Sequence, residues 1–303
     1  METFILLTIT GLGLGAMYFL IASGLSLIYG LMGVLNFAHG AFLSVGAYGT
    51  WWLADQLDGT IDSIVVRFLL GAVFGLAVGA AVAALTELVL IRPLYQRHIE
   101  QVLVTVGLSL AIVALLQGIW GPTERLYPVP DQLFDTTTVL GARIPNDRFL
   151  EIGMAVAVLL GLLAFLNFTR YGLIIRAGVE NRAMVTALGI DVRKAFTLVF
   201  AIGGIAAALA GILSGVYFGS VDPERGTALL IFAFIVVVIG GLGSIMGSAA
   251  AAVIVGLLQQ YANYYGAEYA HASWLGDISV MLLLGLTLLI RPSGLAGKWT
   301  VAH

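Results

Sequence analysis

The residues best suited to chemistry lie in a short polar interruption between two apolar runs, Asn36-Phe37-Ala38-His39-Gly40. An amide and an imidazole within a membrane are costly, so they are normally buried against protein or line a water-filled cavity. Glycine permits the helix to break here, and a break is tolerated only inside protein or beside a cavity. Two compatible interpretations stay open. Asn36, Phe37, His39 and Gly40 line the path of a solute, or Asn36 and His39 satisfy the backbone of a structural kink.

A second interruption is rich in glycine, and its candidate path residues are Gly240, Gly241, Gly243 and Ser244. Four glycines fall within residues 240–247, which is too dense for an ordinary helix, so we predict a break. No strand precedes these glycines and no basic residue accompanies them, which excludes a phosphate-binding or dinucleotide-binding loop.

The third interruption is a basic segment, residues 170–194. Within it, Val179 to Leu188 predicts a short helix that Gly189 ends. Apolar residues recur at helical spacing on one face of this helix. Such a helix lies in the lipid interface or seats in a groove on a partner protein.

Composition places these interruptions in a membrane protein. Of 303 residues, 60 % are hydrophobic and only 10 % charged, whereas soluble domains carry about 25 % charged residues. The net charge of −3 offers no basic surface for nucleic acid. The chain has no cysteine, and its four histidines are too scattered for a metal cluster, so we expect no metal site.

Apolar runs long enough to approach a membrane span recur along the chain. We therefore predict an all-α, polytopic transmembrane bundle of eight or nine membrane segments, with Gly-rich broken or re-entrant helices. The second and seventh runs are the doubtful spans. The runs are 5–30, 38–54, 64–91, 99–120, 149–169, 195–219, 227–240, 247–265 and 275–291.

The distribution of Lys and Arg predicts the orientation of these segments. Residues 91–98, 170–194 and 291–303 hold nine of the fourteen basic residues, while the other connections, including the largest at 121–148, are acidic. The two kinds of connection alternate if the N-terminus is outside and the C-terminus is cytoplasmic.

Two further patterns concern the membrane segments. The stretches 5–91 and 227–292 both contain a Gly-rich break and end in Arg-Pro, which suggests a parallel repeat or merely a common way to stop a helix. Glu87 is interpreted as the lone acid within a spanning run, paired with Arg92 near the helix end.

In this order, these pieces resemble the membrane-spanning subunits of the branched-chain (hydrophobic) amino acid ABC importers. The resemblance covers nearly the whole chain and is most specific in the Asn-Phe-Ala-His-Gly and Gly-Gly-Leu-Gly-Ser strings. The matching stretches are Gly11–Gly30, Asn36–Gly40, Gly46–Tyr48, Arg92-Pro93, Thr105–Ser109, Arg176-Ala177, Ala187–Ile190, Gly240–Ser244 and Arg291–Leu295.

The resemblance implies a single transmembrane permease domain over 1–303, in a bacterial cytoplasmic (inner) membrane, without a catalytic centre or bound cofactor. Such a subunit is similar to one half of a pore, whose other half is a second permease. In the family, two cytoplasmic ATPase subunits that bind ATP and Mg²⁺ drive transport through this pore. A soluble solute-binding protein delivers the solute to it. The 170–194 loop then resembles the segment that couples to the ATPase. Its candidate coupling residues are Arg176, Glu180, Asn181, Arg182, Ala187 and Gly189.

The resemblance leaves the solute open. Many relatives carry Glu directly after the Asn-x-Ala-His-Gly string, whereas this chain has Ala41. The family resembles transporters of branched-chain amino acids and also of urea, amides and small organic acids. A secondary transporter or a passive channel for a small solute is the alternative. A secondary transporter would need ionisable coupling residues in the membrane. A channel would need a selectivity filter, for which Gly240–Ser244 is the candidate.

Overall fold

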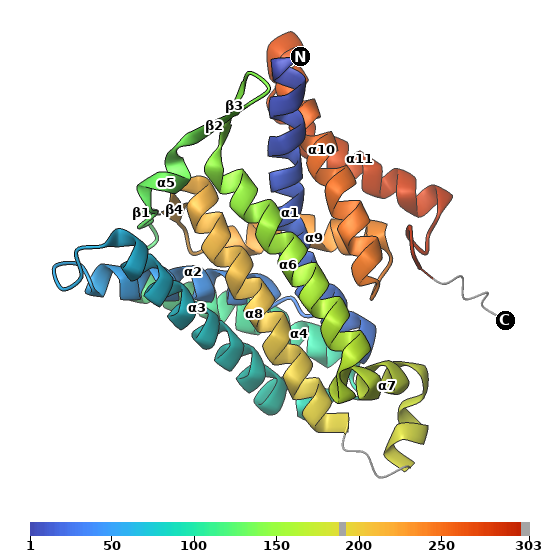
Figure 1. Ribbon diagram of the computed structural model, residues 1–303. Coiled ribbons are helices and arrows are strands. Elements are labelled where there is room, and N and C mark those ends of the chain that lie inside the picture. The colour runs from blue at the N-terminus through green and yellow to red at the C-terminus, as the bar shows by residue number, and fades with distance from the viewer. Residues whose placement is uncertain (188–191, 298–303) are drawn as a thin grey trace.

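The computed structural model describes residues 1–187 and 192–297, and within this part nearly all regular structure is helical (Figure 1). The long helices are α1 (Glu2–Met32), α3 (Ile64–Thr86), α4 (His98–Trp120), α6 (Asn146–Phe168), α8 (Val192–Phe218) and α10 (Ile245–Ala270). The shorter ones are α2 (His39–Gln56), the π-helix η1 (Glu87–Ile91), the 3-10 helix η2 (Arg92–Leu94), α5 (Asp131–Phe134), α7 (Arg170–Ala187), α9 (Arg225–Gly240) and α11 (Leu275–Ile290).

The nine predicted apolar runs all form helices, which confirms the helical polytopic class. Six of these helices are long and apolar enough to cross a membrane: α1, α3 with its extension to Leu94, α4, α6, α8 and α10. The runs 38–54, 227–240 and 275–291 form the shorter helices α2, α9 and α11. Of the two doubtful spans, α2 follows the break at residues 33–38 and α9 precedes the break at residues 241–244.

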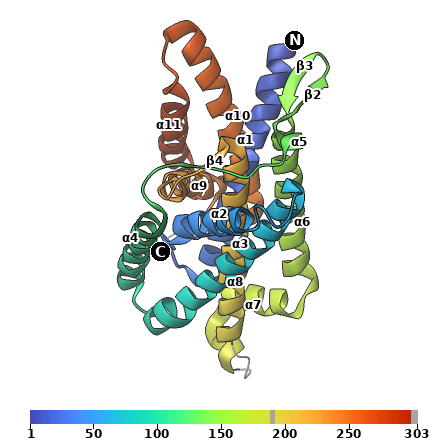
Figure 2. The ribbon, with the colours of Figure 1, turned by 90° about the vertical axis from the view of Figure 1, so that its left-hand side faces the viewer.

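Four short strands lie at one end of the molecule. Strands β2 (Thr136–Val139) and β3 (Ala142–Pro145) form a hairpin, and β1 (Arg125–Leu126) pairs antiparallel with β4 (Ser220–Val221). The N-terminus lies at this end, whereas α7 lies at the opposite end (Figures 1 and 2). The acidic connection 121–148 and the basic segment that contains α7 are therefore on opposite sides of the bundle.

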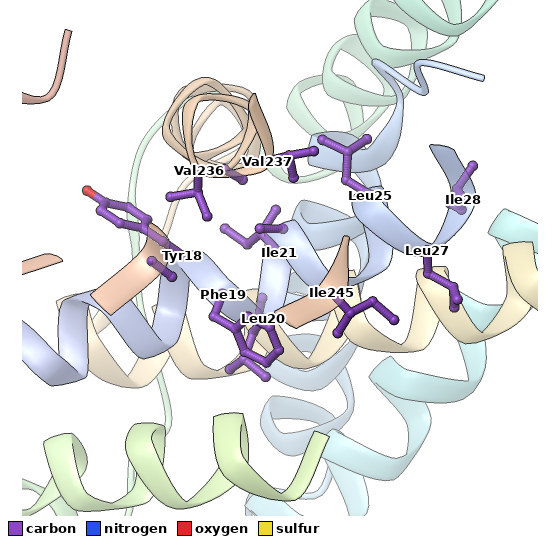
Figure 3. Packing of buried hydrophobic residues seen from close by; sticks show 14 of the residues in the cluster. Tyr18, Phe19, Leu20, Ile21, Leu25, Leu27, Ile28, Val236, Val237 and Ile245 are labelled. Carbon is purple, nitrogen blue, oxygen red and sulfur yellow. The ribbon is translucent and has the colours of Figure 1, made fainter. Parts of the chain in front are cut away.

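The core is built around α1, which lies in the middle of the bundle. Tyr18 stacks on Phe232 of α9 with ring centroids 5.3 Å apart. Figure 3 shows Val236 and Val237 on the side of α1 that carries Tyr18 and Ile21, and Ile245 on the side that carries Leu20. The backbones approach closely because the contact positions are small: a Cβ carbon on Gly15 would lie 2.5 Å from the carbonyl oxygen of Ala252. Small residues at helix contacts are the usual device of membrane bundles.

The peripheral helices present apolar side chains outward. Val73 of α3 is 67 % exposed, Leu160 of α6 is 60 % exposed and Leu289 of α11 is 85 % exposed. A soluble protein could not tolerate this surface, whereas lipid tails accept apolar side chains on the outside of a bundle whose backbone bonds are satisfied within its helices.

The structure favours a different repeat from the one suggested by the Arg-Pro ends. Helices α1 and α8 are each followed by a break of equal length, residues 33–38 and 219–224, and then by the short helices α2 and α9. Both breaks begin with a glycine at positive φ, 65° at Gly33 and 68° at Gly219. Helix α1 runs away from the N-terminal end whereas α8 runs back toward it, so these units are inverted (Figure 1). In the suggested parallel pairing, the paired helices differ in length, since α1 has 31 residues and α9 has 16.

Candidate functional site

The chain break after α1 positions the first candidate residues. Gly33 adopts the left-handed conformation and its N–H bonds to the carbonyl oxygen of Tyr29 at 2.8 Å, which ends the helix. Asn36 forms the turn before α2: its Oδ1 accepts the N–H of Ala38 at 3.1 Å, and its own carbonyl oxygen accepts the N–H of His39 at 3.3 Å. An Asn side chain that bonds the backbone two residues on is a common way to start a turn. The break and the kink are therefore present, and Asn36 satisfies part of the freed backbone.

Asn36 also has an unused donor. Its side chain is 1 % exposed, and Nδ2 has no hydrogen-bond partner among the described residues. Buried polar atoms are nearly always paired with protein or water, and leaving one unpaired costs about 1–3 kcal/mol. The Nδ2 donor is therefore both buried and unpaired among the described residues.

A pocket of ≈ 230 Å³ adjoins this amide, between the break, α4 and α9. Most of its wall is apolar, and Phe37 lies near Phe234 with ring centroids 6.4 Å apart. The backbone N–H of Phe37 donates to Thr105 Oγ1 of α4 at 3.3 Å, which fixes the break against that helix. An apolar pocket with a few polar groups is the usual character of a small-molecule site. The polar side chains that line it are Asn36, Ser109 and Thr227.

The other two candidate residues of the string, His39 and Gly40, lie in the packing between helices and do not line this pocket. His39 is 0 % exposed; its Nε2 lies 3.1 Å from the carbonyl oxygen of Ile21, and its ring fills the space beside Gly24. Gly40 packs on Gly226, where a Cβ carbon would lie 2.5 Å from the carbonyl oxygen. The structure thus brings Asn36 and Phe37 to the pocket and uses His39 and Gly40 to join α2 to α1 and α9.

The second break, between α9 and α10, is also present but does not line this pocket. Gly241 and Gly243 have positive φ, 99° and 82°, and Ser244 Oγ accepts the N–H of Gly247 at 3.0 Å to cap α10. A Cβ carbon on Gly243 would lie 2.7 Å from Gly30 Cα, so the break packs on the end of α1. Gly240 accepts the N–H of Ala296 at 3.0 Å, which covers the break with the chain after α11.

This second break faces the segment predicted to couple with a partner. Gly243, Ser26 and Arg176 line a separate pocket of ≈ 210 Å³ at the end of α1. Arg176 belongs to α7 and donates to Asn167 Oδ1 of α6 at 3.0 Å. The second break, at Gly240–Ser244, and the pocket at Asn36 are therefore distinct parts of the structure.

Helix α7 is longer than the sequence indicated. It begins at Arg170 rather than Val179 and extends to Ala187, and Thr169 opens it by accepting the N–H of Gly172 on its Oγ1 at 2.9 Å. Glu180, Asn181 and Arg182 lie within this helix, and their side chains fall outside the described part. Gly189, predicted to end the helix, is also outside it.

Sequence reasoning overlooked three further acids in the predicted spanning runs, Glu100, Glu151 and Asp277, of which Glu151 is buried. Glu151 of α6 is 0 % exposed and lies 3.4 Å from Arg148 Nη1, so Glu87 is not the lone acid of the spanning runs. Arg148 stacks over the ring of Tyr217, 3.4 Å from its centroid, and also approaches Asp147 at 3.5 Å. The signal was present in the spacing of Asp147, Arg148 and Glu151 at a helix start.

Glu87 itself is part of a polar network where α3 becomes a π-helix. It is 0 % exposed, accepts from Thr197 Oγ1 of α8 at 2.6 Å, and lies 3.3 Å from Arg92 Nη2. Tyr95 donates to the same carboxylate. The predicted pair with Arg92 is confirmed, and the carboxylate also bonds to α8 across the bundle.

Comparison with known proteins identifies the family. The model of the family described as "Branched-chain amino acid transport system / permease component" matches residues 7–290. This chain belongs to that family. The resemblance inferred from the sequence motifs is thereby confirmed.

Among its relatives, the branched-chain amino acid transport permease BraD of Pseudomonas aeruginosa is 29 % identical over 96 % of this chain and 94 % of its own length. The permease LivH of Escherichia coli K12 is 30 % identical over 95 % and 94 %. A solved structure, PsaBC from Streptococcus pneumoniae in complex with Fab, has 15 % identity and a TM-score of 0.46 over 93 % of this chain and 89 % of that chain.

Proposed function

We propose that this chain is the transmembrane permease subunit of an ATP-driven importer and forms half of its translocation pore. The observation that carries the proposal is the family match over residues 7–290, together with relatives named as branched-chain amino acid transport permeases. In this proposal 1–303 is one permease domain without a catalytic centre. It lies in a bacterial inner membrane with its N-terminus outside, as the basic residues at the α7 end indicate.

The proposal assigns the other activities to partners. A second permease, identical or homologous, completes the pore; two cytoplasmic ATPase subunits hold ATP and Mg²⁺; a soluble solute-binding protein delivers the solute. Helix α7 projects from the end opposite the N-terminus, which suits the predicted contact with an ATPase subunit (Figure 1). The candidate coupling residues are Arg176, Glu180, Asn181, Arg182, Ala187 and Gly189.

The pocket at Asn36 is proposed as part of the path. Its apolar wall suits an aliphatic side chain, and the free Nδ2 of Asn36 can donate to a carboxylate or carbonyl oxygen. Ala41 is 0 % exposed and adds no charge there. A branched-chain amino acid therefore fits this chemistry, and urea, a short amide or a small organic acid remains a related candidate. Gly240–Ser244 are the second predicted element of the path.

Uptake of radiolabelled leucine into proteoliposomes tests this assignment. The assembled transporter should take up leucine only when both ATP and the solute-binding protein are present. Asn36→Ser keeps an oxygen for the Ala38 N–H but removes Nδ2, so uptake should fall about tenfold, the equivalent of one lost hydrogen bond to a charged group. Asn263→Ser is the matched control, because Asn263 bonds the Gly276 N–H at 2.9 Å far from the pocket.

Two outcomes would contradict the proposal. If the chain alone moves solute without ATP, it is a secondary transporter or a channel. If Asn36→Ser and His39→Ala both retain normal uptake, the first break has only a structural role. A separate pair, Arg182→Glu and Ala187→Trp, should uncouple ATP hydrolysis from uptake; normal stimulation of the ATPase by the binding protein in both variants would remove α7 from the coupling role.

A further inference from the structure

An open groove of ≈ 490 Å³ lies at the α7 end of the molecule, beside the polar network of Glu87. It is formed where the π-helical end of α3 meets the starts of α7 and α8. One rim is cationic and the wall is apolar. The residues that matter here are Leu88, Arg92, Tyr171, Lys194, Thr197 and Leu198.

The two cations at the rim are in different situations. Arg92 is held by Glu87 and by Thr197 Oγ1, which accepts from Nη2 at 2.9 Å, while 34 % of its side chain remains exposed. Lys194 is exposed and has no hydrogen bond or ion pair to any residue in the described part. Since Glu87 neutralises only one of these charges, the rim carries a net positive charge and suits an anion.

The wall of the groove distinguishes a lipid from a soluble anion. Leu88 is 41 % exposed on the extension of α3, and Leu198 lies on α8, so both belong to helices long and apolar enough to cross a membrane. Tyr171 stands at the rim and is 47 % exposed, as expected of a ring at the boundary between acyl chains and headgroups. An occupant with an anionic head and apolar chains matches both parts, whereas a free anion would leave the wall uncovered.

We propose that this groove binds one anionic phospholipid, with its phosphate between Arg92 and Lys194 and an acyl chain along Leu88 and Leu198. Basic pockets between membrane helices at the cytoplasmic side commonly hold such headgroups. Tyr171 lies in the first turn of α7 and Lys194 lies in the first turn of α8. A bound lipid therefore links the first turns of these two helices, on either side of the segment proposed to couple with the ATPase.

Native mass spectrometry of the full-length chain, with the subunits that assemble with it, tests the proposal. The protein is released from nanodiscs that contain equal phosphatidylglycerol and phosphatidylcholine. Wild type should retain one phosphatidylglycerol in preference to phosphatidylcholine. Lys194→Gln should lower that retention about fivefold, and Lys194→Glu further, because each cation near the surface contributes a comparable factor.

Arg97→Gln is the matched control. Arg97 is a cation at the same end, but it is 66 % exposed, pairs with Glu100 at 3.1 Å and does not line the groove, so retention should be unchanged. Lys194 is exposed and unpaired among the described residues, so its variants should unfold at the wild-type temperature and their lipid loss can be attributed to the site.

Four results would overturn the proposal. These are equal retention of both lipids by wild type, unchanged retention in both Lys194 variants, displacement of the lipid by excess inorganic phosphate, and retention only when the ATPase subunits are absent. The third would show a site for a soluble anion, and the fourth a surface that a partner covers. None of these measurements involves transport, and only the fourth needs the ATPase subunits of the proposed function, so a failure of that function is distinguishable from a failure of the lipid site.

Discussion

Gly40 and Gly226 hold the backbones of α2 and α9 in direct contact: a Cβ carbon on Gly40 would lie 2.5 Å from the carbonyl oxygen of Gly226, and one on Gly226 would overlap the carbonyl oxygen of Gly40. Each is the second residue of its helix, after a break of equal length. The contact is therefore reciprocal between equivalent positions of the two inverted units. Gly24 and Gly203 make a looser contact of the same kind between α1 and α8, with a Cβ 2.8 Å from the opposing carbonyl oxygen.

Gly226→Ala should destabilise the protein by about 1–3 kcal/mol, because the added methyl group must push α2 and α9 apart. The measurement is the thermal unfolding temperature in detergent, followed by tryptophan fluorescence. Gly107→Ala is the control: nothing lies within 4 Å of its Cβ position in the exposed helix α4, so it should be neutral or slightly stabilising. Equal effects of the two substitutions would show that the α2–α9 contact is not tight.

His39→Ala and Asn36→Ser should separate stability from transport. The first removes a fully buried ring and its bond to the carbonyl oxygen of Ile21, so it should cost about 2–4 kcal/mol of stability. The second should lower uptake while the unfolding temperature changes little. A stable His39→Ala variant with impaired uptake would instead support the predicted role of His39 in the path.

Arg92→Gln should cost about 3 kcal/mol, because it leaves the carboxylate of Glu87, which is 0 % exposed, without its cation. Thermal unfolding is again the measurement. The matched substitution Arg97→Gln removes an ion pair whose partners are 66 % and 49 % exposed, and should cost less than about 0.5 kcal/mol. If Arg92→Gln and Arg97→Gln unfold at the same temperature, the network around the π-helix contributes nothing to stability.

The ion pair between Glu124 and Arg225 should make stability depend on pH at acidic values. Hydrogen bonds from Ser220 and then from Arg225, whose Nη2 lies 2.8 Å away, lower the pKa of Glu124 from its ordinary 4.5. A lowered pKa in the folded state means that the contribution is complete above 4.5 and is lost as the pH falls through the lower value.

The unfolding temperature of the wild type should therefore fall more steeply below pH 4.5 than that of Glu124→Gln, which cannot titrate at this position. Parallel pH profiles for the two proteins would remove Glu124 as a source of this dependence. The bond between Ser220 and Glu124 joins the connection after α4 to the break before α9, so the loss should be largest at this end of the molecule.

Much of the fold could be predicted because membrane helices leave a strong local signal. Runs such as 64–91 and 99–120 are apolar throughout, and the breaks at 33–38 and 241–244 are marked by glycine and by Asn36. The extra length of α7 was missed because its first residues carry no apolar period. The inverted repeat was missed because the sequence of α9 does not resemble that of α2, and only the shared break and close contact reveal it.

The candidate site was predicted less completely. The string 36–40 was found from its cost in a membrane, but its residues separate in space. Asn36 and Phe37 lie in the break and line the pocket, whereas His39 is the first residue of α2 and faces α1. Thr227 and Ser109 come from distant parts of the chain and carry no local signal. Glu151 could have been found, since a buried acid beside Arg148 at helical spacing is visible in the sequence.

The sequence by itself determined that this chain is a helical membrane protein, where its helices break and which family it belongs to, because apolar length and costly polar residues are local properties. Only the tertiary structure decided which side chains share a pocket, which glycines join helices, and that Arg92 and Lys194 meet at one groove. Those relationships depend on how helices far apart in the chain pack together. That packing is set by the close approach of small residues on several helices at once.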